Sequence, residues 1–199
     1  MGTVYRELAD RLSVAQIRLG LGTRWLSEFV MILLRMIGGL REGDAAALAS
    51  GRRNRIWCAK LRDMPDLASR GWDPDFPDFA VVSRDAILTS LRQLVGDASE
   101  EQLRAWRDSI PSLQAEAGEV LAAYAQAKGY GAVLEYVLPL DARRPDCVFL
   151  IEVSVLVLEL KGKTQPTQAD IDQASAYARA LRCFHRECAE RPVHALLFA

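Results

Sequence analysis

Charged side chains interrupt two hydrophobic runs in the segment RRPDCVFLIEVSVLVLELK, which covers residues 143–161. Asp146 opens the first run, while Glu159 and Lys161 close the second. Burying ionised groups inside a protein is unfavourable unless they pair with each other or bind a metal ion. The sequence therefore predicts that these three side chains share a polar site at the ends of two strands.

A hairpin brings these residues together. If the two runs pair around a turn near Glu152 and Val153, Asp146 falls opposite Glu159, and directly opposed residues have Cβ atoms about 5 Å apart. Period-two alternation then places Lys161 on the same face as Glu159. Two carboxylates at this separation repel each other, and a hard cation with a preference for oxygen ligands, Mg2+ or Mn2+, removes that penalty.

The predicted group of residues has the composition needed for phosphodiester hydrolysis. A divalent ion between Asp146 and Glu159 would lower the pKa of a water and offset charge on a phosphate oxygen during an in-line displacement. The ammonium group of Lys161 would orient the attacking water or neutralise the pentacovalent phosphate. We therefore expect Asp146, Glu159 and Lys161 to be catalytic.

The surrounding pattern predicts a mixed α/β domain over residues 111–199. One helical stripe is expected to end near Lys128 and Gly129, and Thr167 with Asp170 predicts the start of a second helix. Runs rich in Val, Ile, Leu and aromatic residues predict strands. The expected order is helix, three strands, helix and strand, with strands at 132–138, 145–151, 153–160 and 193–198.

Upstream, residues 1–110 are predicted to form a mainly α-helical region, because apolar residues recur there at helical spacing. The segment from Met64 to Pro77 is dense in Pro, Gly and Asp and is expected to be a loop. Ser99 followed by Gln102 predicts a capping box that opens a short helix containing Trp106.

The composition favours a protein of the cytoplasm. The chain has 25 basic and 26 acidic residues, so any basic surface must be local. Its four cysteines form no disulfide pattern, which is typical of a reducing compartment. We find neither a signal peptide nor an apolar run long enough to cross a bilayer, and therefore expect no membrane partner.

PD followed by ExK, within the expected helix and strand order, resembles the PD-(D/E)xK nuclease superfamily. The resemblance implies a restriction-endonuclease-like core in which Asp146, Glu159 and the backbone carbonyl of Leu160 hold Mg2+ or Mn2+. It also implies that Gln173 and Tyr177 line the active site, because their spacing matches the Q-x3-Y pattern of several branches of that superfamily.

Residues 115–199 further resemble the nuclease domain found upstream of schlafen-group-3-like helicases in bacteria. This resemblance implies a metal-dependent nuclease acting on DNA, in defence against foreign DNA such as that of viruses, with a helicase in cis or in trans. The chain ends within its last predicted strand, where these relatives continue into the helicase.

Several assignments stay open at this point. An acidic residue that completes the site is expected at Glu116, Glu119 or Glu135; we prefer Glu119, with Glu135 as a close rival because a lone carboxylate in a strand needs an explanation. Arg143, Arg144 and Lys163 are candidates for contacts with nucleic acid, although Arg143 and Arg144 are equally expected as solvated turn residues.

Two other functions compete with the nuclease. The first is a nucleic-acid-binding module that has lost hydrolysis. The second is an oligomerisation or docking domain, in which the apolar helix from Phe29 to Met36 forms a homodimer or seats a helicase. The substrate is expected to be DNA, with RNA as the alternative.

Overall fold

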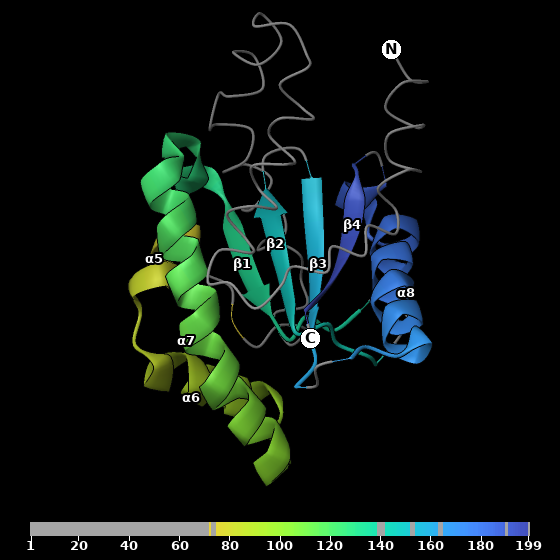
Figure 1. Cartoon of the computed structure of the whole chain (residues 1–199), viewed down its shortest axis with the longest axis horizontal. Helices are drawn as coiled ribbons and strands as arrows, with labels where there is room; N and C mark the ends of the chain where they lie inside the picture. The colour runs from red at the N-terminus through yellow and green to blue at the C-terminus, as the bar shows by residue number, and fades with distance from the viewer. Residues whose placement is uncertain are drawn as a thin grey trace, which may run out of the picture.

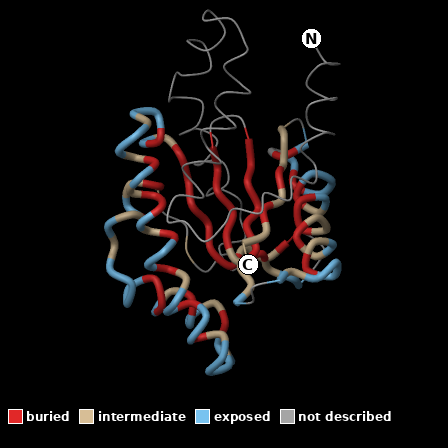
Figure 2. The backbone as a smooth tube through the Cα atoms, viewed as in Figure 1, coloured by how far each residue is buried: buried red, intermediate tan, exposed pale blue. Residues whose placement is uncertain are grey.

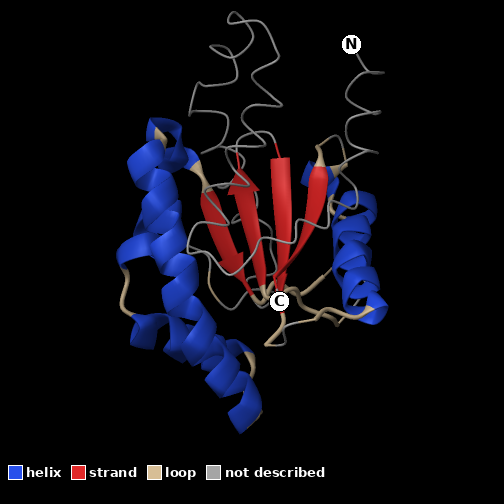
Figure 3. Ribbon diagram, viewed as in Figure 1, coloured by secondary structure: helices blue, strands red, loops and turns tan. Residues whose placement is uncertain are grey.

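The computed structural model of the chain describes residues 72, 75–138, 142–151, 154–162, 165–189 and 191–198. Its helices are α5 (Phe76–Val81), α6 (Arg84–Leu94), α7 (Glu100–Ala123) and α8 (Gln168–Phe184), joined by the short 3-10 helices η2 (Ala125–Gly129) and η3 (Arg186–Cys188). The strands are β1 (Gly131–Leu134), β2 (Cys147–Ile151), β3 (Ser154–Leu160) and β4 (Val193–Phe198). From α7 onward the order is the expected α-β-β-β-α-β, and the architecture is mixed α/β (Figure 3).

The four strands form one sheet in the order β1-β2-β3-β4. β1 and β2 are antiparallel, as are β2 and β3, whereas β4 runs parallel to β3. The parallel pair requires a crossover, which α8 supplies between β3 and β4. Because β1, β3 and β4 all end at the same end of the sheet as the start of β2, residues from all four strands meet there.

Helices cover both faces of the sheet. Figure 1 shows α5, α6 and α7 on one side and α8 on the other. Alternate strand residues divide accordingly: Phe149 and Leu156 pack with the α5–α7 layer, whereas Val148 and Val157 pack with Tyr177 and Leu181 of α8. Strands β1, β2 and β3 are therefore the most buried part of the fold, β4 is half-buried, and many exposed residues lie on the outer helix surfaces (Figure 2).

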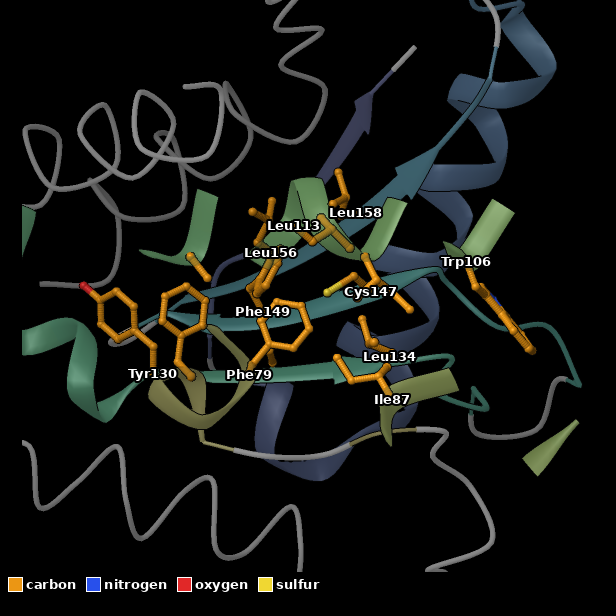
Figure 4. Packing of buried hydrophobic residues seen from close by; sticks show 14 of the residues in the cluster. Phe79, Ile87, Trp106, Leu113, Tyr130, Leu134, Cys147, Phe149, Leu156 and Leu158 are labelled. Atoms are coloured by element: carbon orange, nitrogen blue, oxygen red, sulfur yellow. The ribbon is translucent and has the colours of Figure 1, made fainter. Parts of the chain in front are cut away.

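Helix α5 belongs to the core of the sheet. Phe76 and Phe79 are buried at 1% and 0% exposure, and both stack edge-on against Phe149 of β2. Figure 4 shows Phe79, Phe149 and Leu156 meeting side by side in this layer. The expected loop from Met64 to Pro77 is therefore wrong at its end: Asp75 and Trp72 form bridges to β1, and α5 starts at Phe76.

Helix α7 is longer than the sequence predicts. Ser99 accepts a hydrogen bond from the Gln102 N–H and caps the start of the helix, as expected. The helix then continues past Pro111 and has 24 residues in total. Burial of Ile110 and Leu113 on either side of the proline holds the helix together across this position. The boundary expected between residues 110 and 111 falls inside this helix, so the described helices before it share the core of the sheet.

Other boundaries differ slightly. The first helix of the expected core ends at Ala123 and passes into η2, rather than continuing to Lys128. β1 ends at Leu134, not at Leu138, because Glu135 has a positive φ of 52° that breaks the extended backbone. The predicted capping box of Thr167 and Asp170 is confirmed at the start of α8.

Some expectations concern parts of the chain outside the described residues. These are the helices of residues 1–71, including the apolar helix from Phe29 to Met36, and the contact expected from Lys163. Among the helices that the structure does describe, none combines the length and apolar character needed to cross a membrane.

Candidate active site

The pairing of β2 with β3 has the register that the sequence predicts. Cys147 lies opposite Leu158, and Ile151 lies opposite Ser154. One residue beyond this ladder, the carboxylate of Asp146 accepts a hydrogen bond from the backbone N–H of Leu160 at 2.7 Å. Cys147 and Leu158 both face the α5–α7 layer, so alternation directs Glu159 to the α8 face, while Asp146, just before β2, lines a cleft beside α7.

Lys161 lies at the same point. Its Nζ donates a hydrogen bond to Oε1 of Glu159 at 2.8 Å and contacts Oε1 of Gln173 at 3.3 Å. Nε2 of Gln173 in turn donates to Glu159 at 3.0 Å and to the Tyr177 hydroxyl at 2.6 Å. Gln173 and Tyr177 are one turn apart on α8, so Gln173 contacts Glu159 and Lys161 directly, whereas Tyr177 contacts Gln173.

The two arginines before Asp146 differ in their surroundings. Arg143 is exposed, and its guanidinium carbon lies 5.4 Å from the centroid of the Tyr177 ring. Arg144 is more enclosed, and its Nε lies 3.3 Å from Oε2 of Glu135. Both arginines therefore contact residues at the site's edge.

Of the acidic residues expected to complete the site, the structure brings Glu135 close and not Glu119. Glu135 is buried, and its Oε1 accepts a hydrogen bond from the Trp106 indole N–H at 2.8 Å. Glu119 is exposed on α7 and Glu116 is buried in the same helix, but neither lines the cleft beside Asp146 and Lys161. The structure does not bring Glu119 to the cleft, because α7 lines it with its earlier turns, around Trp106, and Glu119 lies more than three turns further along.

Burial and mutual repulsion shift the acids of the site. Burial and the nearby charge of Glu159 raise the pKa of Asp146 from 3.8 to about 7. Burial also raises the pKa of Glu159, although the hydrogen bond from Lys161 opposes this shift. The pKa of Lys161 is raised because its hydrogen bond and charge interaction with Glu159 outweigh the effect of burial. Burial and like charge therefore disfavour the ionised carboxylates, which a cation would stabilise.

The donor atoms fit a divalent ion in part. Oε2 of Glu159 is buried without a hydrogen-bond partner among the described residues, and such an atom is stabilised by a cation. Within this part of the chain there is no cluster of three or more His, Cys, Asp or Glu side chains that could hold a metal. An ion here would therefore need Asp146, Glu159 and main-chain or water oxygens, a ligand set that Mg2+ accepts.

A cleft of about 400 Å³ adjoins these residues. One wall is formed by the first half of α7, which contributes Gln102, Trp106, Asp108, Ser109 and Ser112. The opposite wall is formed by residues at the edge of the sheet, namely Glu135, Asp146, Leu160, Lys161, Gly162 and Phe198. Figure 1 shows this half of α7 extending past the end of the sheet where β3 and β4 finish. The cleft gives a ligand access to Asp146 and Lys161.

Sequence reasoning missed the contact between Trp106 and Glu135. The two residues are 29 positions apart, and no local spacing relates a helix tryptophan to a glutamate at a strand end. The available signal was that each side chain is unusual for its element, since a buried indole N–H and a buried carboxylate both need a partner.

In comparisons with known proteins, no family model, curated protein or solved structure matches this chain.

Proposed function

We propose that this chain is a divalent-metal-dependent nuclease with a restriction-endonuclease-like core, and that it hydrolyses phosphodiester bonds in DNA. The observation that carries the proposal is the convergence of Asp146, Glu159 and Lys161 at one end of the sheet. The first is tied to Leu160 and the other two are hydrogen-bonded to each other. Two carboxylates beside a lysine are the groups that metal-assisted hydrolysis of a phosphate diester requires, and two of the three residues, Asp146 and Lys161, line the cleft.

The metal would be held by Asp146, by Glu159 through its Oε2 atom, and by the backbone carbonyl of Leu160. A bound Mg2+ or Mn2+ supplies a Lewis acid and a water of lowered pKa. The hydrogen bond from the Leu160 N–H fixes one oxygen of Asp146 and leaves the other for a ligand. The ionised carboxylates of Asp146 and Glu159 repel each other without a cation, and together they would attract one.

Lys161 would act on the reacting groups themselves. Its ammonium is anchored by Glu159 and Gln173 and lines the cleft, so its remaining donor capacity is directed at a bound phosphate. There it would orient the attacking water or stabilise the charge that develops on the non-bridging oxygens. Water adds to phosphorus, the bond from phosphorus to the departing oxygen breaks, and that oxygen takes up a proton.

Gln173 would be a positioning residue. It contacts Glu159, Lys161 and Tyr177 at once, so it sets the direction of both the carboxylate and the ammonium. Tyr177 supports it from the next turn of α8, and the Arg143 guanidinium lies over the Tyr177 ring. This chain of contacts supplies the rigid support that an active site needs.

The test is a cleavage assay with supercoiled plasmid, linear duplex and single-stranded DNA, and with RNA, in Mg2+, Mn2+ or EDTA. We expect cleavage of DNA only with a divalent ion, and a loss of at least about 100-fold in Asp146→Asn and Lys161→Ala. Matched controls are Asp97→Asn and Lys128→Ala, which make the same changes at exposed positions away from the site.

Three results would contradict the proposal. Cleavage that persists in EDTA would exclude a metal mechanism. Cleavage that survives Asp146→Asn or Lys161→Ala would place the activity elsewhere. Tight binding of DNA without cleavage under any condition would favour a binding module that has lost hydrolysis.

A further inference from the structure

Glu135 has an unusual backbone conformation. It is the one non-glycine residue with positive φ in the described part of the chain, at 52°. A side chain in this region is strained, and such strain persists where the surrounding structure imposes it, often beside a functional site. The backbone N–H of Glu135 donates to the Asp146 carbonyl at 3.2 Å, so this conformation lies directly beside the candidate metal ligand.

Both carboxylate oxygens of Glu135 face protein donors. Oε1 accepts from the Trp106 indole at 2.8 Å, and Oε2 lies 3.3 Å from Nε of Arg144. This differs from Glu159, whose Oε2 is buried without a hydrogen-bond partner among the described residues. A metal ligand needs an accessible lone pair, whereas an anchor for a cationic side chain needs the arrangement found at Glu135.

Arg144 pairs with Glu135 through one nitrogen and remains partly exposed to solvent. Its Nε is the atom that lies close to Glu135, and 28% of its side chain remains exposed, against 6% for Glu135. A guanidinium carries five N–H donors in a planar fork, so pairing through Nε leaves its terminal nitrogens for a second anion. Arg144 also precedes Asp146 by only two residues, which puts that fork at the margin of the site.

We propose that Trp106 and Glu135 are positioning residues that hold Arg144, and that Arg144 binds a backbone phosphate next to the cleaved bond. Glu135 is then an anchor and not a ligand of the metal. This inference rests on the proposed nuclease function for the identity of the anion. It assigns to the first half of α7 a task in the site, since α7 carries the indole that fixes Glu135.

Whether Glu135→Gln weakens or tightens DNA binding tests whether Glu135 anchors Arg144. We would measure the affinity for a fluorescein-labelled DNA oligonucleotide by anisotropy in EDTA, at several salt concentrations. Removing an acid near a polyanion ordinarily tightens binding, and the exposed control Glu101→Gln should do so slightly or have no effect. Glu135→Gln should instead weaken binding, because Arg144 loses its anchor.

The expected losses have a definite pattern. Arg144→Gln should weaken binding about tenfold and lower the slope of log affinity against log salt by about 0.9 for duplex DNA, the value for one phosphate contact. Glu135→Gln should lose somewhat less, and the double variant no more than Arg144→Gln alone. Trp106→Phe, which removes the indole donor, should act in the same direction. Circular dichroism melts establish that each variant is folded.

A second readout separates an anchor from a metal ligand. Binding of Mn2+, followed by electron paramagnetic resonance, should be retained in Glu135→Gln and lost in Glu159→Gln. Loss of Mn2+ binding in Glu135→Gln, tighter DNA binding by this variant, or wild-type DNA affinity and salt slope in Arg144→Gln would each overturn the inference. A wild-type chain that binds no oligonucleotide at low salt would overturn it too. Wild-type chain that binds DNA without cleaving it would count against the proposed nuclease and leave the anchor supported.

Discussion

The backbone N–H of Leu160 donates a hydrogen bond to Oδ2 of Asp146 at 2.7 Å, which ties the residue before β2 to the last residue of β3. This contact keeps Asp146 beside Glu159, and burial together with the charge of Glu159 raises the pKa of Asp146. The fold thus maintains two carboxylates in a repulsive arrangement. Residues that oppose stability in this way are typical of functional sites.

Asp146→Asn should stabilise the protein and abolish metal binding. The amide keeps an oxygen that can accept from Leu160 and removes one of the repelling charges. In EDTA at about pH 8 we expect the free energy of unfolding to rise by on the order of 1 kcal/mol, or roughly 2–4 °C in Tm. Thermal melts with and without Mn2+ measure both effects. A variant that melts below the wild type and still gains stability from Mn2+ would contradict this expectation.

The stability of the metal-free protein should depend on the charge of Asp146. Its pKa rises from 3.8 to about 7 on folding, so across that range the folded protein holds a proton that the unfolded chain has released. Its contribution to the free energy of unfolding therefore falls as pH rises towards 7, and is level above it. His194 acts in the opposite direction, because burial lowers its pKa from 6.5 to about 4 and stability rises with pH between these values.

Comparison of the wild type with Asp146→Asn isolates the contribution of Asp146 to the free energy of unfolding. The stability advantage of the variant should be smallest at and below about pH 4, grow between about pH 4 and about pH 7 and level off above about pH 8. Urea denaturation in EDTA at each pH gives the difference, and saturating Mn2+ should remove it at high pH. An advantage that is constant across this range would mean that Asp146 is not the titrating group.

Gln173 should matter more than Tyr177. Gln173→Ala removes the contacts to Glu159 and Lys161, and we expect kcat to fall about tenfold with little change in KM. Tyr177→Phe removes only the hydroxyl that Gln173 contacts and should cost less than about threefold. Because Tyr177 reaches the site through Gln173, the double variant should match Gln173→Ala. Additive losses would show that Tyr177 acts independently.

Phe76 tests whether α5 is part of the core of the sheet. It lies before the residues of the candidate site in the sequence, yet it is 1% exposed and its ring stacks edge-on against Phe149 at a centroid distance of 5.8 Å. Phe76→Ala should lower the free energy of unfolding by about 3–5 kcal/mol. Val81→Ala, at an 82% exposed position of the same helix, is the control and should change little. A small effect at Phe76 would mean that the sheet folds without α5.

The sequence itself determined the hairpin and therefore the centre of the site. A short turn between two runs sets the register of antiparallel strands, and period-two alternation then sets the face of every residue. For this reason Asp146, Glu159 and Lys161 could be placed together from spacing alone. Spacing also placed Gln173 and Tyr177 on one face of a helix and predicted the capping box of Thr167, whereas only the resemblance to a known family implied that this face lines the site.

Only the tertiary structure decided which residues surround that centre. The proline at position 111 predicts an interruption, but burial of Ile110 and Leu113 against the sheet outweighs the missing backbone donor, and α7 continues. That continuity carries Trp106 to Glu135, a contact between residues 29 positions apart. Local periodicity reports which face a residue occupies within its own element, whereas the partner of a buried carboxylate depends on how separate elements pack. The choice of Glu135 over Glu119 was therefore made by packing.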